Sequence, residues 1–179
     1  MKILLLSDTH GLQDETEQVI QQQKDMDMYL HLGDIGFDLK VLHAFDIVSG
    51  NHDRFASIPK ELIKTIEGRH VLCMHGNLFD DETMEEVLAM HAIDEEDIMD
   101  ICMRTLHHKL AVYAKSKGCD TVFFGHTHHQ VAQCVDGVWL VNPGSLCFGT
   151  PQSGYAVVEI KGSDIQATFY KSMGIENTK

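Results

Sequence analysis

Positive charge is scarce in this chain: 14 Lys and Arg stand against 27 Asp and Glu, which gives a formal net charge of −13. A surface that tracks nucleic-acid phosphates needs clustered cations, and the sequence has no run of Lys or Arg. We therefore expect no nucleic-acid-tracking surface. An anionic ligand is still compatible with this composition, because bound divalent cations would offset the carboxylates around them.

Paired cysteines and long apolar runs are missing as well. The five Cys show no CxxC spacing, and their odd number excludes a complete disulfide framework. The apolar run before Ser7 covers only residues 3–6, which is too short for a signal peptide. No window approaches the roughly 20 apolar residues that a membrane span needs. These absences predict a cytoplasmic protein with free thiols and no membrane partner.

What the chain does contain is an alternation of short apolar runs and helical patterns, which is typical of an α/β protein. Its 179 residues fit one domain and are enough to bury a core. The first half predicts a largely parallel sheet with a surface helix at 14–24. Its strands are expected at 3–6, 28–32 and 45–48, and a hairpin of 61–66 and 70–74 follows them.

The last third carries short strands separated by Gly or Asp turns. Asp136-Gly137 lies between two apolar runs and is a strong hairpin signal, and Gly162-Ser163 has the same place later in the chain. The strands are expected at 121–124, 130–135, 138–141, 155–160 and 165–170. They predict a second, mainly antiparallel sheet, so that two sheets pack face to face with helices outside.

Between these regions, residues 80–117 show a helical pattern. Acidic residues at 80–82 and 94–97 suit the first turns of helices, because they offset the positive end of the helix dipole. Apolar residues then recur at helical spacing from Ile98 to Tyr113. We expect helices at about 82–91 and 94–117, which either cover a sheet or cap the functional site with their tips.

Short motifs supply most of the candidate ligands, and most of them follow an apolar run. They are Asp8-Thr9-His10, Gly33-Asp34, Gly50-Asn51-His52-Asp53, His75-Gly76 and Gly125-His126-Thr127-His128. A polar residue that follows a strand lies at the carboxyl edge of the sheet, where open α/β folds hold their ligands. Oxygen and imidazole ligands without thiolate suit Mn²⁺, Fe or Zn. The motifs therefore predict a metal site shared by several strand ends.

The spacing within the motifs suggests roles for single residues. Two adjacent divalent cations need a bridging carboxylate, and Asp34, alone after its Gly, is the best candidate. Asp8 and His10 are two positions apart on an extended segment, so both can face the same side, and the last motif repeats this spacing. His75 and Asn51 complete the set. The neutral amide of Asn51 adds no negative charge against an incoming phosphate.

In this order, the motifs resemble those of the calcineurin-like metallophosphoesterase superfamily. The short length, Asn142-Pro143-Gly144-Ser145 and Gly154-Tyr155-Ala156-Val157 are similar to its small single-domain prokaryotic phosphodiesterase branch. The likeness runs from residue 1 to about residue 171. It implies a single domain over residues 1–179, folded as a four-layer α/β/β/α sandwich of two mixed sheets flanked by helices. Residues 80–117 are longer than in that branch, which makes them a helical insertion.

The resemblance also implies two ligand sets that share one carboxylate. One metal takes Asp8, His10, Asp34 and His128, and the other takes Asp34, Asn51, His75 and His126. We expect two divalent ions, with Mn²⁺ as the first choice and Fe, Ni or Zn as alternatives.

The chemistry that follows is hydrolysis of a small phosphodiester. A hydroxide that bridges the metals would attack phosphorus in line, while the metals neutralise the phosphoryl charge. His52, next to a ligand but outside both sets, is the candidate general acid for the leaving alkoxide, and either Asp53 or Asp38 would orient it. Arg54 is a candidate contact to a phosphate oxygen.

Other functions stay open on the same residues. A phosphomonoesterase would use the same two metals. A non-catalytic metal-binding scaffold on the same fold, similar to the retromer subunit of vacuolar sorting, belongs to a different class. Such a scaffold has an impaired site, whereas every proposed ligand and the candidate acid are present here. A homodimer through residues 80–117 or through a sheet edge would also fit.

Overall fold

The first sheet combines strands from both ends of the chain. In the computed structural model, which describes residues 1–54, 57–89 and 95–172, three parallel strands are neighbours: β1 (Lys2–Leu6), β2 (Met28–His31) and β3 (Asp46–Ile47). On the other side of β1 lie β9 (Gly154–Lys161) and then β10 (Asp164–Lys171), both antiparallel to their neighbours. The order is β10-β9-β1-β2-β3.

The second sheet has the order β4-β5-β6-β8-β7. The hairpin of β4 (Glu61–Ile66) and β5 (Arg69–Met74) lies at one edge, and β7 (Gln130–Val135) pairs antiparallel with β8 (Val138–Pro143) at the other. Between them, β6 (Thr121–Phe123) is parallel to both β5 and β8. This sheet is therefore mixed, like the first.

The composition of the sheets corrects one of our predictions. The last third of the chain does not form a sheet of its own, because β9 and β10 join β1 while β4 and β5 join β6. The physical reason is the burial of β1, whose residues 3–6 are fully buried and which has two edges to pair. Since β2 covers one edge, the equally apolar β9 fills the other. Hairpin signals reveal which strands pair locally, but they do not reveal this distant partner.

Alternate residues of the central strands face different layers. Ile3 and Leu5 belong to the cluster between the two sheets, together with Phe123 and Val141 from the second sheet. Leu4 and Leu6 point to the other face and pack with Val19 of α1 (Gln13–Gln22). Strands buried on both faces read as continuous apolar runs, which explains the Ile-Leu-Leu-Leu sequence of β1.

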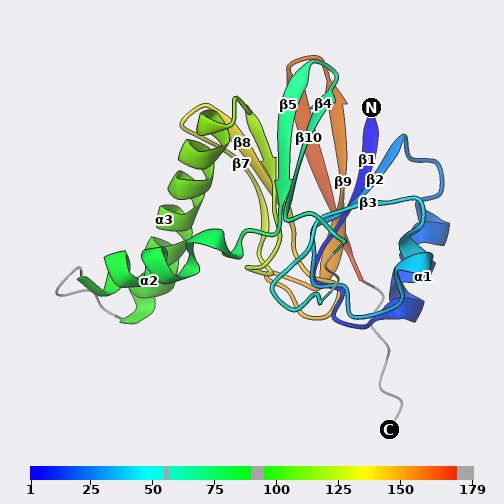
Figure 1. The fold of residues 1–179 in the computed structure, drawn as a ribbon, viewed down its shortest axis with the longest axis horizontal. Coiled ribbons are helices and arrows are strands. Elements are labelled where there is room, and N and C mark those ends of the chain that lie inside the picture. Colours follow the sequence, from blue (N-terminus) through cyan, green and yellow to red (C-terminus); the bar gives the residue numbers. More distant parts are fainter. Residues whose placement is uncertain (55–56, 90–94, 173–179) are drawn as a thin grey trace, which may run out of the picture.

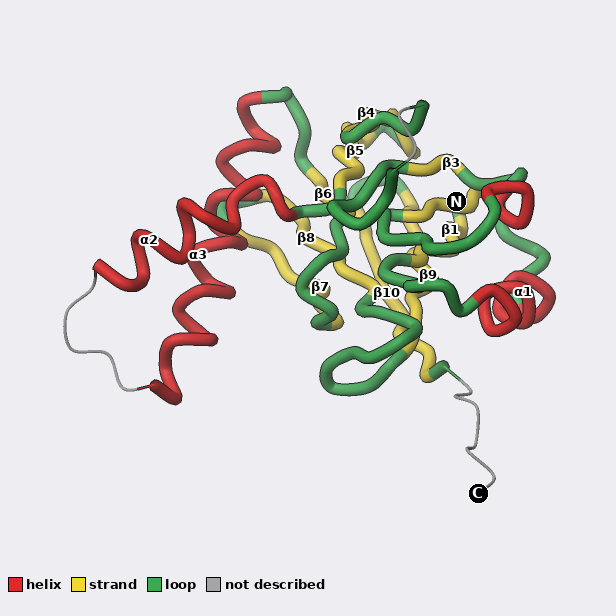
Figure 2. The backbone as a smooth tube through the Cα atoms, turned by 60° about the horizontal axis from the view of Figure 1, so that its bottom comes forward, coloured by secondary structure: helices red, strands yellow, loops and turns green. Residues whose placement is uncertain are grey.

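The outer face of the second sheet is covered by a long helix, α3 (Glu95–Ser116), through a cluster that includes Leu106 and Leu110. Figure 1 shows α1 and α3 on opposite sides of the two sheets, and the turned view in Figure 2 keeps them apart. The four-layer α/β/β/α sandwich is confirmed. The shorter helix α2 (Asp80–Ala89) packs beside α3, and both extend away from the sheets at that end (Figure 1).

The predicted helices in residues 80–117 exist with shifted ends. α2 begins two residues before its predicted start, while the ends that we placed at 91 and 94 lie outside the described residues. Two 3₁₀ turns were not predicted, at Leu39–Leu42 and Asn77–Phe79. Within the described part of the chain, no helix combines the length and apolar character needed to cross a membrane.

Candidate metal centre

The predicted ligands lie together at the carboxyl ends of strands from both sheets. Asp8 follows β1 and Asp34 follows β2, while His75 follows β5 and the last motif follows β6. Backbone hydrogen bonds join their loops: the Asp8 amide donates to the Gly33 carbonyl at 3.0 Å, and the Gly125 amide donates to the His75 carbonyl at 2.8 Å. The site therefore spans the junction between the two sheets.

Three buried side chains, Asp8, Asp34 and His75, form what we call the floor of the site. His75 Nε2 lies 3.4 Å from Asp34 Oδ2 and 3.9 Å from Asp8 Oδ1. The other ring nitrogen, Nδ1, is 2.7 Å from the Leu32 carbonyl. Because a carbonyl only accepts, Nδ1 carries the proton, and Nε2 is the nitrogen that faces the carboxylates.

Two partly exposed histidines lie above this floor. His128 Nε2 is 3.1 Å from Asp8 Oδ1, and His10 Nε2 is 3.3 Å from His128 Nε2. His10 Nε2 also lies 4.0 Å from Asp34 Oδ2. Asp34 thus faces His10 on one side and His75 on the other, one histidine from each predicted ligand set.

Asn51 and His126 are the remaining predicted ligands. We call the more exposed side chains around the floor the rim: His10, Asn51, His52, His126 and His128. Asn51 Oδ1 lies 3.0 Å from His75 Nε2, so the amide does reach the floor. The His126 amide donates to Asp8 Oδ2 at 3.0 Å, but its ring Nε2 is 2.7 Å from Asp80 Oδ2. That contact leaves Nδ1 as the His126 ring nitrogen that is free to bind a metal.

The backbone at five of the predicted ligands has a strained, left-handed conformation that the sequence analysis did not predict. Asp8, His10, Asp34, His126 and His128 all have positive φ, between 45° and 66°. Non-glycine residues rarely adopt this left-handed region, and when they do they cluster at functional sites. The left-handed turns aim side chains from three separate loops at one point, which extended segments would not do.

Glycines in the motifs leave room for the carboxylates. A Cβ on Gly50 would lie 2.1 Å from Asp34 Oδ1, and a Cβ on Gly125 would lie 2.7 Å from Asp8 Oδ2. Either methyl group would displace a floor residue. The Gly of GNHD and the Gly of GHTH are therefore required by close approach.

His52 reaches the site from the solvent side. Its amide donates to Asp34 Oδ1 at 2.9 Å, its ring Nε2 lies 3.9 Å from Asp34 Oδ2, and its side chain is 69% exposed. Asp53 and Asp38, which we considered as its orienting partners, form no hydrogen bond or ion pair with the ring within the described residues. Asp53 instead accepts from the amides of Asp34, Ile35 and Gly50, and Asp38 caps the Leu39–Leu42 turn.

Two positioning residues, Asn142 and Ser145, were missed by the sequence analysis, which used Asn142-Pro143-Gly144-Ser145 only for its resemblance to the family. Ser145 Oγ donates to the Asp8 carbonyl at 2.7 Å, and Asn142 Nδ2 donates to the Gly125 carbonyl at 2.7 Å. Both side chains are fully buried. This segment therefore ties the first motif to the last, and the only signal for it was the place of the motif directly after a strand.

The floor is electrostatically coupled. Burial raises the pKa of Asp34, but the hydrogen bond and charge of His75 outweigh it and bring the pKa to about 2. Burial lowers the pKa of His75, but Asp34 and Asp8 raise it above its ordinary value. The pKa of Asp8 is lowered because His128 and His75 outweigh its burial. A metal ion bound here would therefore compete with a proton for His75 Nε2, because a metal ligand must be deprotonated.

The arrangement fits divalent metal ions. Two groups of side chains bring their ligand atoms within 4.8 Å of one another: Asp8, His10 and His128, and Asp8, Asp34 and His75. Carboxylate oxygens and ring nitrogens that converge in a partly buried site repel one another unless a cation lies between them. Asp8 belongs to both groups, so the structure presents a second carboxylate, besides the predicted Asp34, that is shared between two groups of candidate ligands.

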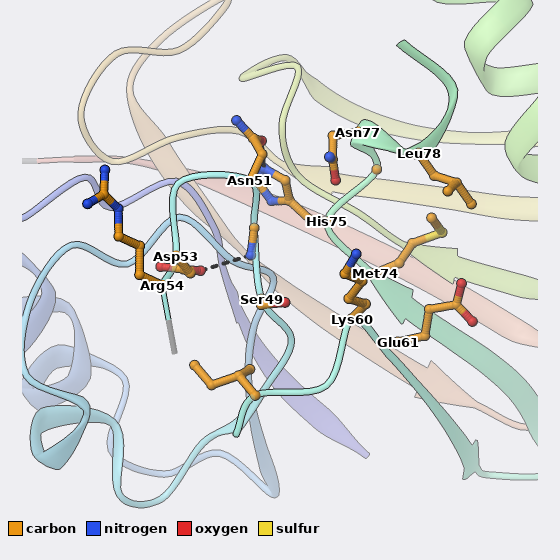
Figure 3. A pocket seen from close by; sticks show the side chains of 13 residues that line it. Ser49, Asn51, Asp53, Arg54, Lys60, Glu61, Met74, His75, Asn77 and Leu78 are labelled. Carbon is orange, nitrogen blue, oxygen red and sulfur yellow. Dashed lines mark hydrogen bonds between the residues drawn. The ribbon is translucent and has the colours of Figure 1, made fainter. Parts of the chain in front are cut away.

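A cavity of about 530 Å³ adjoins the floor at His75 and Asn51. Arg54, our candidate phosphate contact, lines it, and Figure 3 shows Arg54 on one side of the cavity with Leu78 on the opposite side. Asp53 is held beneath by the Gly50 amide (Figure 3). The cavity therefore opens directly beside the predicted ligands His75 and Asn51.

Comparison with known proteins agrees with the geometry. A family model for the calcineurin-like phosphoesterase superfamily domain matches residues 1–163. The probable metallophosphoesterase YsnB of Bacillus subtilis (strain 168) is 25% identical over 181 residues, which cover 98% of this chain and 94% of the relative. The phosphodiesterase MJ0936 of Methanocaldococcus jannaschii is 29% identical over 175 residues, covering 90% and 95%.

Solved structures share the fold. A conserved Streptococcus pneumoniae TIGR4 protein, described as a predicted phosphoesterase, superposes with a TM-score of 0.74 at 24% identity, covering 96% of this chain and 89% of that one. A Vps29 mutant from Entamoeba histolytica superposes with a TM-score of 0.64 at 17% identity, covering 96% and 100%. The sandwich, the motifs at its strand ends and the match over residues 1–163 establish that this chain belongs to the calcineurin-like metallophosphoesterases.

Proposed function

We propose that this protein is a binuclear metal-dependent phosphodiesterase that acts on a small phosphodiester. The observation that carries the proposal is the convergence of the Asp8 and Asp34 carboxylates with the Nε2 atoms of His10, His75 and His128. Bound there, two divalent ions, with Mn²⁺ as first choice, would supply an activated water for in-line attack on phosphorus and neutralise its oxygens.

The chain's own residues would divide the remaining work. Asp34 would be a ligand in both sets, since its carboxylate lies between His10 and His75. His52 donates a proton to the leaving oxygen, because its ring is near Asp34, open to solvent and absent from both ligand sets. Arg54, at the cavity wall, binds a phosphoryl oxygen through its guanidinium group.

The first experiment is hydrolysis of bis(4-nitrophenyl) phosphate by chelator-treated protein, with and without added Mn²⁺. We expect turnover only with metal, and slower release of 4-nitrophenolate from the monoester 4-nitrophenyl phosphate. The opposite preference would make the protein a phosphomonoesterase. Metal binding without turnover of either ester would favour the scaffold alternative. Vps29 shares the fold of this chain.

The acid role of His52 has its own signature. 4-Nitrophenolate leaves readily without a proton, whereas phenolate from diphenyl phosphate depends more on an acid. We therefore expect His52→Ala to lower kcat for diphenyl phosphate by about 100-fold or more and for the nitrophenyl ester by less. His70→Ala, at the exposed end of the β4–β5 hairpin, is the matched control. Equal losses on both esters would assign His52 to substrate binding instead.

A further inference from the structure

The cavity beside the metal centre has an unusual charge balance for this acidic chain. Its ionisable wall residues are Asp53, Arg54, Lys60, Glu61 and His75. The formal charge of the whole protein is −13, so a cavity in which cations prevail would stand out from the remaining surface. Whether they prevail depends on what each carboxylate already binds.

Both carboxylates of the wall are occupied. Asp53 Oδ2 accepts from the amides of Asp34 and Gly50, each at 2.8 Å, and Oδ1 accepts from Ile35 at 2.9 Å. Glu61 accepts from the Tyr113 hydroxyl, and its other oxygen lies 3.2 Å from Lys117 Nζ. The charge of Glu61 is thus offset by Lys117, the residue after α3, and Asp53 is directed at the backbone.

The two cations of the wall are available. Arg54 and Lys60 are exposed, and within residues 1–54, 57–89 and 95–172 neither has a carboxylate within ion-pair distance. In Figure 3, the Lys60 side chain points toward the part of the cavity where His75 and Asn77 lie. A cation that is held near a polar cavity without a protein partner is suited to a ligand anion.

The remaining wall is partly apolar. Ile58, Met74 and Leu78 line the cavity together with the Asn77 amide. An apolar surface favours an organic group, whereas a bare inorganic anion would gain nothing from it. The combination of a carbon-containing body and an anionic end describes the ligand that this cavity would bind best.

We propose that this cavity binds one arm of the phosphodiester and that Lys60 selects an arm that carries a carboxylate or phosphate of its own. The inference rests on the proposed function, because it needs a phosphate at the metal centre to present that arm. It adds the class of substrate: a small diester with an additional anionic group. Lys60 would be a specificity-determining residue rather than part of the chemistry.

Two nearly isosteric esters test the proposal. Bis(4-nitrophenyl) phosphate and 4-carboxyphenyl 4-nitrophenyl phosphate differ in one end group, nitro or carboxylate, and both release 4-nitrophenolate. We expect the wild type to have the lower KM for the carboxylate ester. Lys60→Gln should raise that KM by roughly three- to fivefold, the size of an exposed ion pair, and leave the KM of the dinitro ester unchanged.

The control is Lys2→Gln, which removes one positive charge at the start of β1, the opposite end of the sheet from the site. It should alter neither KM. Equal KM values in the wild type, or a Lys60→Gln effect that is the same on both esters, would overturn the proposal.

A binding measurement separates this proposal from the proposed function. If neither ester is hydrolysed with any metal, the phosphodiesterase proposal fails, and a nuclear magnetic resonance titration of the protein with bis(4-carboxyphenyl) phosphate decides the rest. Shifts of the Asn51 and Asn77 signals that weaken in Lys60→Gln and in high salt would support the anion site. Shifts that are the same in Lys60→Gln, or the absence of shifts, would overturn it.

Discussion

The floor and the rim of the metal centre differ in how firmly the fold holds them. Asp8, Asp34 and His75 have side chains that are at most 2% exposed, and each is fixed by a hydrogen bond to backbone or to another ligand. His52 at the rim is 69% exposed and is held mainly through its amide. The floor residues therefore serve both the stability of the fold and the chemistry of the site. The exposed rim residue His52 serves the chemistry alone.

This difference separates two kinds of substitution. A change in the floor alters the free energy of unfolding as well as metal binding, because buried charged groups must keep their partners. A change at the rim alters function with little cost to stability, since solvent replaces the lost contact. The predictions below use this separation, beginning with the floor.

The largest effect is expected for Asp34→Asn. Losing the shared carboxylate should lower kcat/KM by at least about 1,000-fold, because the metals contribute several kcal/mol to the transition state. The lowered pKa of Asp34 stabilises the folded state above pH 3.8, and this stabilisation is lost as the pH falls through about 2. Without this stabilisation, the free energy of unfolding of the chelator-treated variant at pH 7, measured in urea, should be about 2 kcal/mol lower than that of the wild type. A loss of stability in His52→Ala as large as in Asp34→Asn would break the distinction between floor and rim.

Beneath the floor, His31 predicts a dependence of stability on pH. It is fully buried, accepts from the Gly33 amide at Nδ1 and contacts Thr9 Oγ1 with Nε2, so it is held neutral. Burial lowers its pKa to about 4. The unfolded chain binds a proton near pH 6.5, so stability falls as the pH decreases from 6.5 toward 4.

For chelator-treated protein, His31 should contribute a loss of about 2 kcal/mol between pH 7 and pH 5, measured by urea unfolding. The ring signals of His31 should remain those of neutral imidazole over this range. His70→Gln should keep the full dependence, because His70 is exposed. An ordinary titration of His31 near pH 6.5 in the folded protein would contradict the prediction.

Ser145→Ala tests the link between the first and last motifs. The substitution leaves the buried Asp8 carbonyl without its donor, and it removes an acceptor from the Cys147 amide. We expect about 1 to 3 kcal/mol lower stability and weaker metal binding, measured by urea unfolding and calorimetric titration. Ser116→Ala, on the exposed end of α3, should change neither quantity. Weaker metal binding at unchanged stability would show that this link, like a rim residue, supports function without stabilising the fold.

The smallest effect is expected for Asp80→Asn, which acts on the rim through His126. Asp80 is the first residue of α2 and holds His126 Nε2 at 2.7 Å, so it fixes which ring nitrogen faces the metal centre. Metal affinity should fall by about tenfold, as for other outer partners of histidine ligands, at unchanged stability. Asp14→Asn on α1 serves as control. Unchanged metal affinity would show that the tip of α2 does not support the site.

Much of this molecule could be predicted from its residues. Alternating apolar runs identified the strands, and Glu67-Gly68, Asp136-Gly137 and Gly162-Ser163 identified three hairpins that the structure contains. The motifs named the candidate ligands because each follows a strand whose carboxyl end must lie at the sheet edge. These features depend on residues that are near one another in the sequence, so the sequence alone can predict them.

Other features depend on contacts between distant segments. The pairing of β9 with β1 joins residues more than 150 positions apart, and no local pattern specifies it. The contact of Asp80 with His126 and the neutralisation of Glu61 by Lys117 have the same character. They arise because packing α3 on the second sheet also fixes where the preceding and following loops can lie.

The sequence by itself determined the family, the set of candidate metal ligands and the order in which they follow the strands. Only the tertiary structure decided which atoms face one another: the His75 nitrogen that faces the carboxylates, the carboxylate shared by two groups, and the two cations beside the site that have no carboxylate partner among the described residues. The physical reason is that residue types set the available chemistry, whereas left-handed backbone turns, buried hydrogen bonds and packing between sheets set its direction.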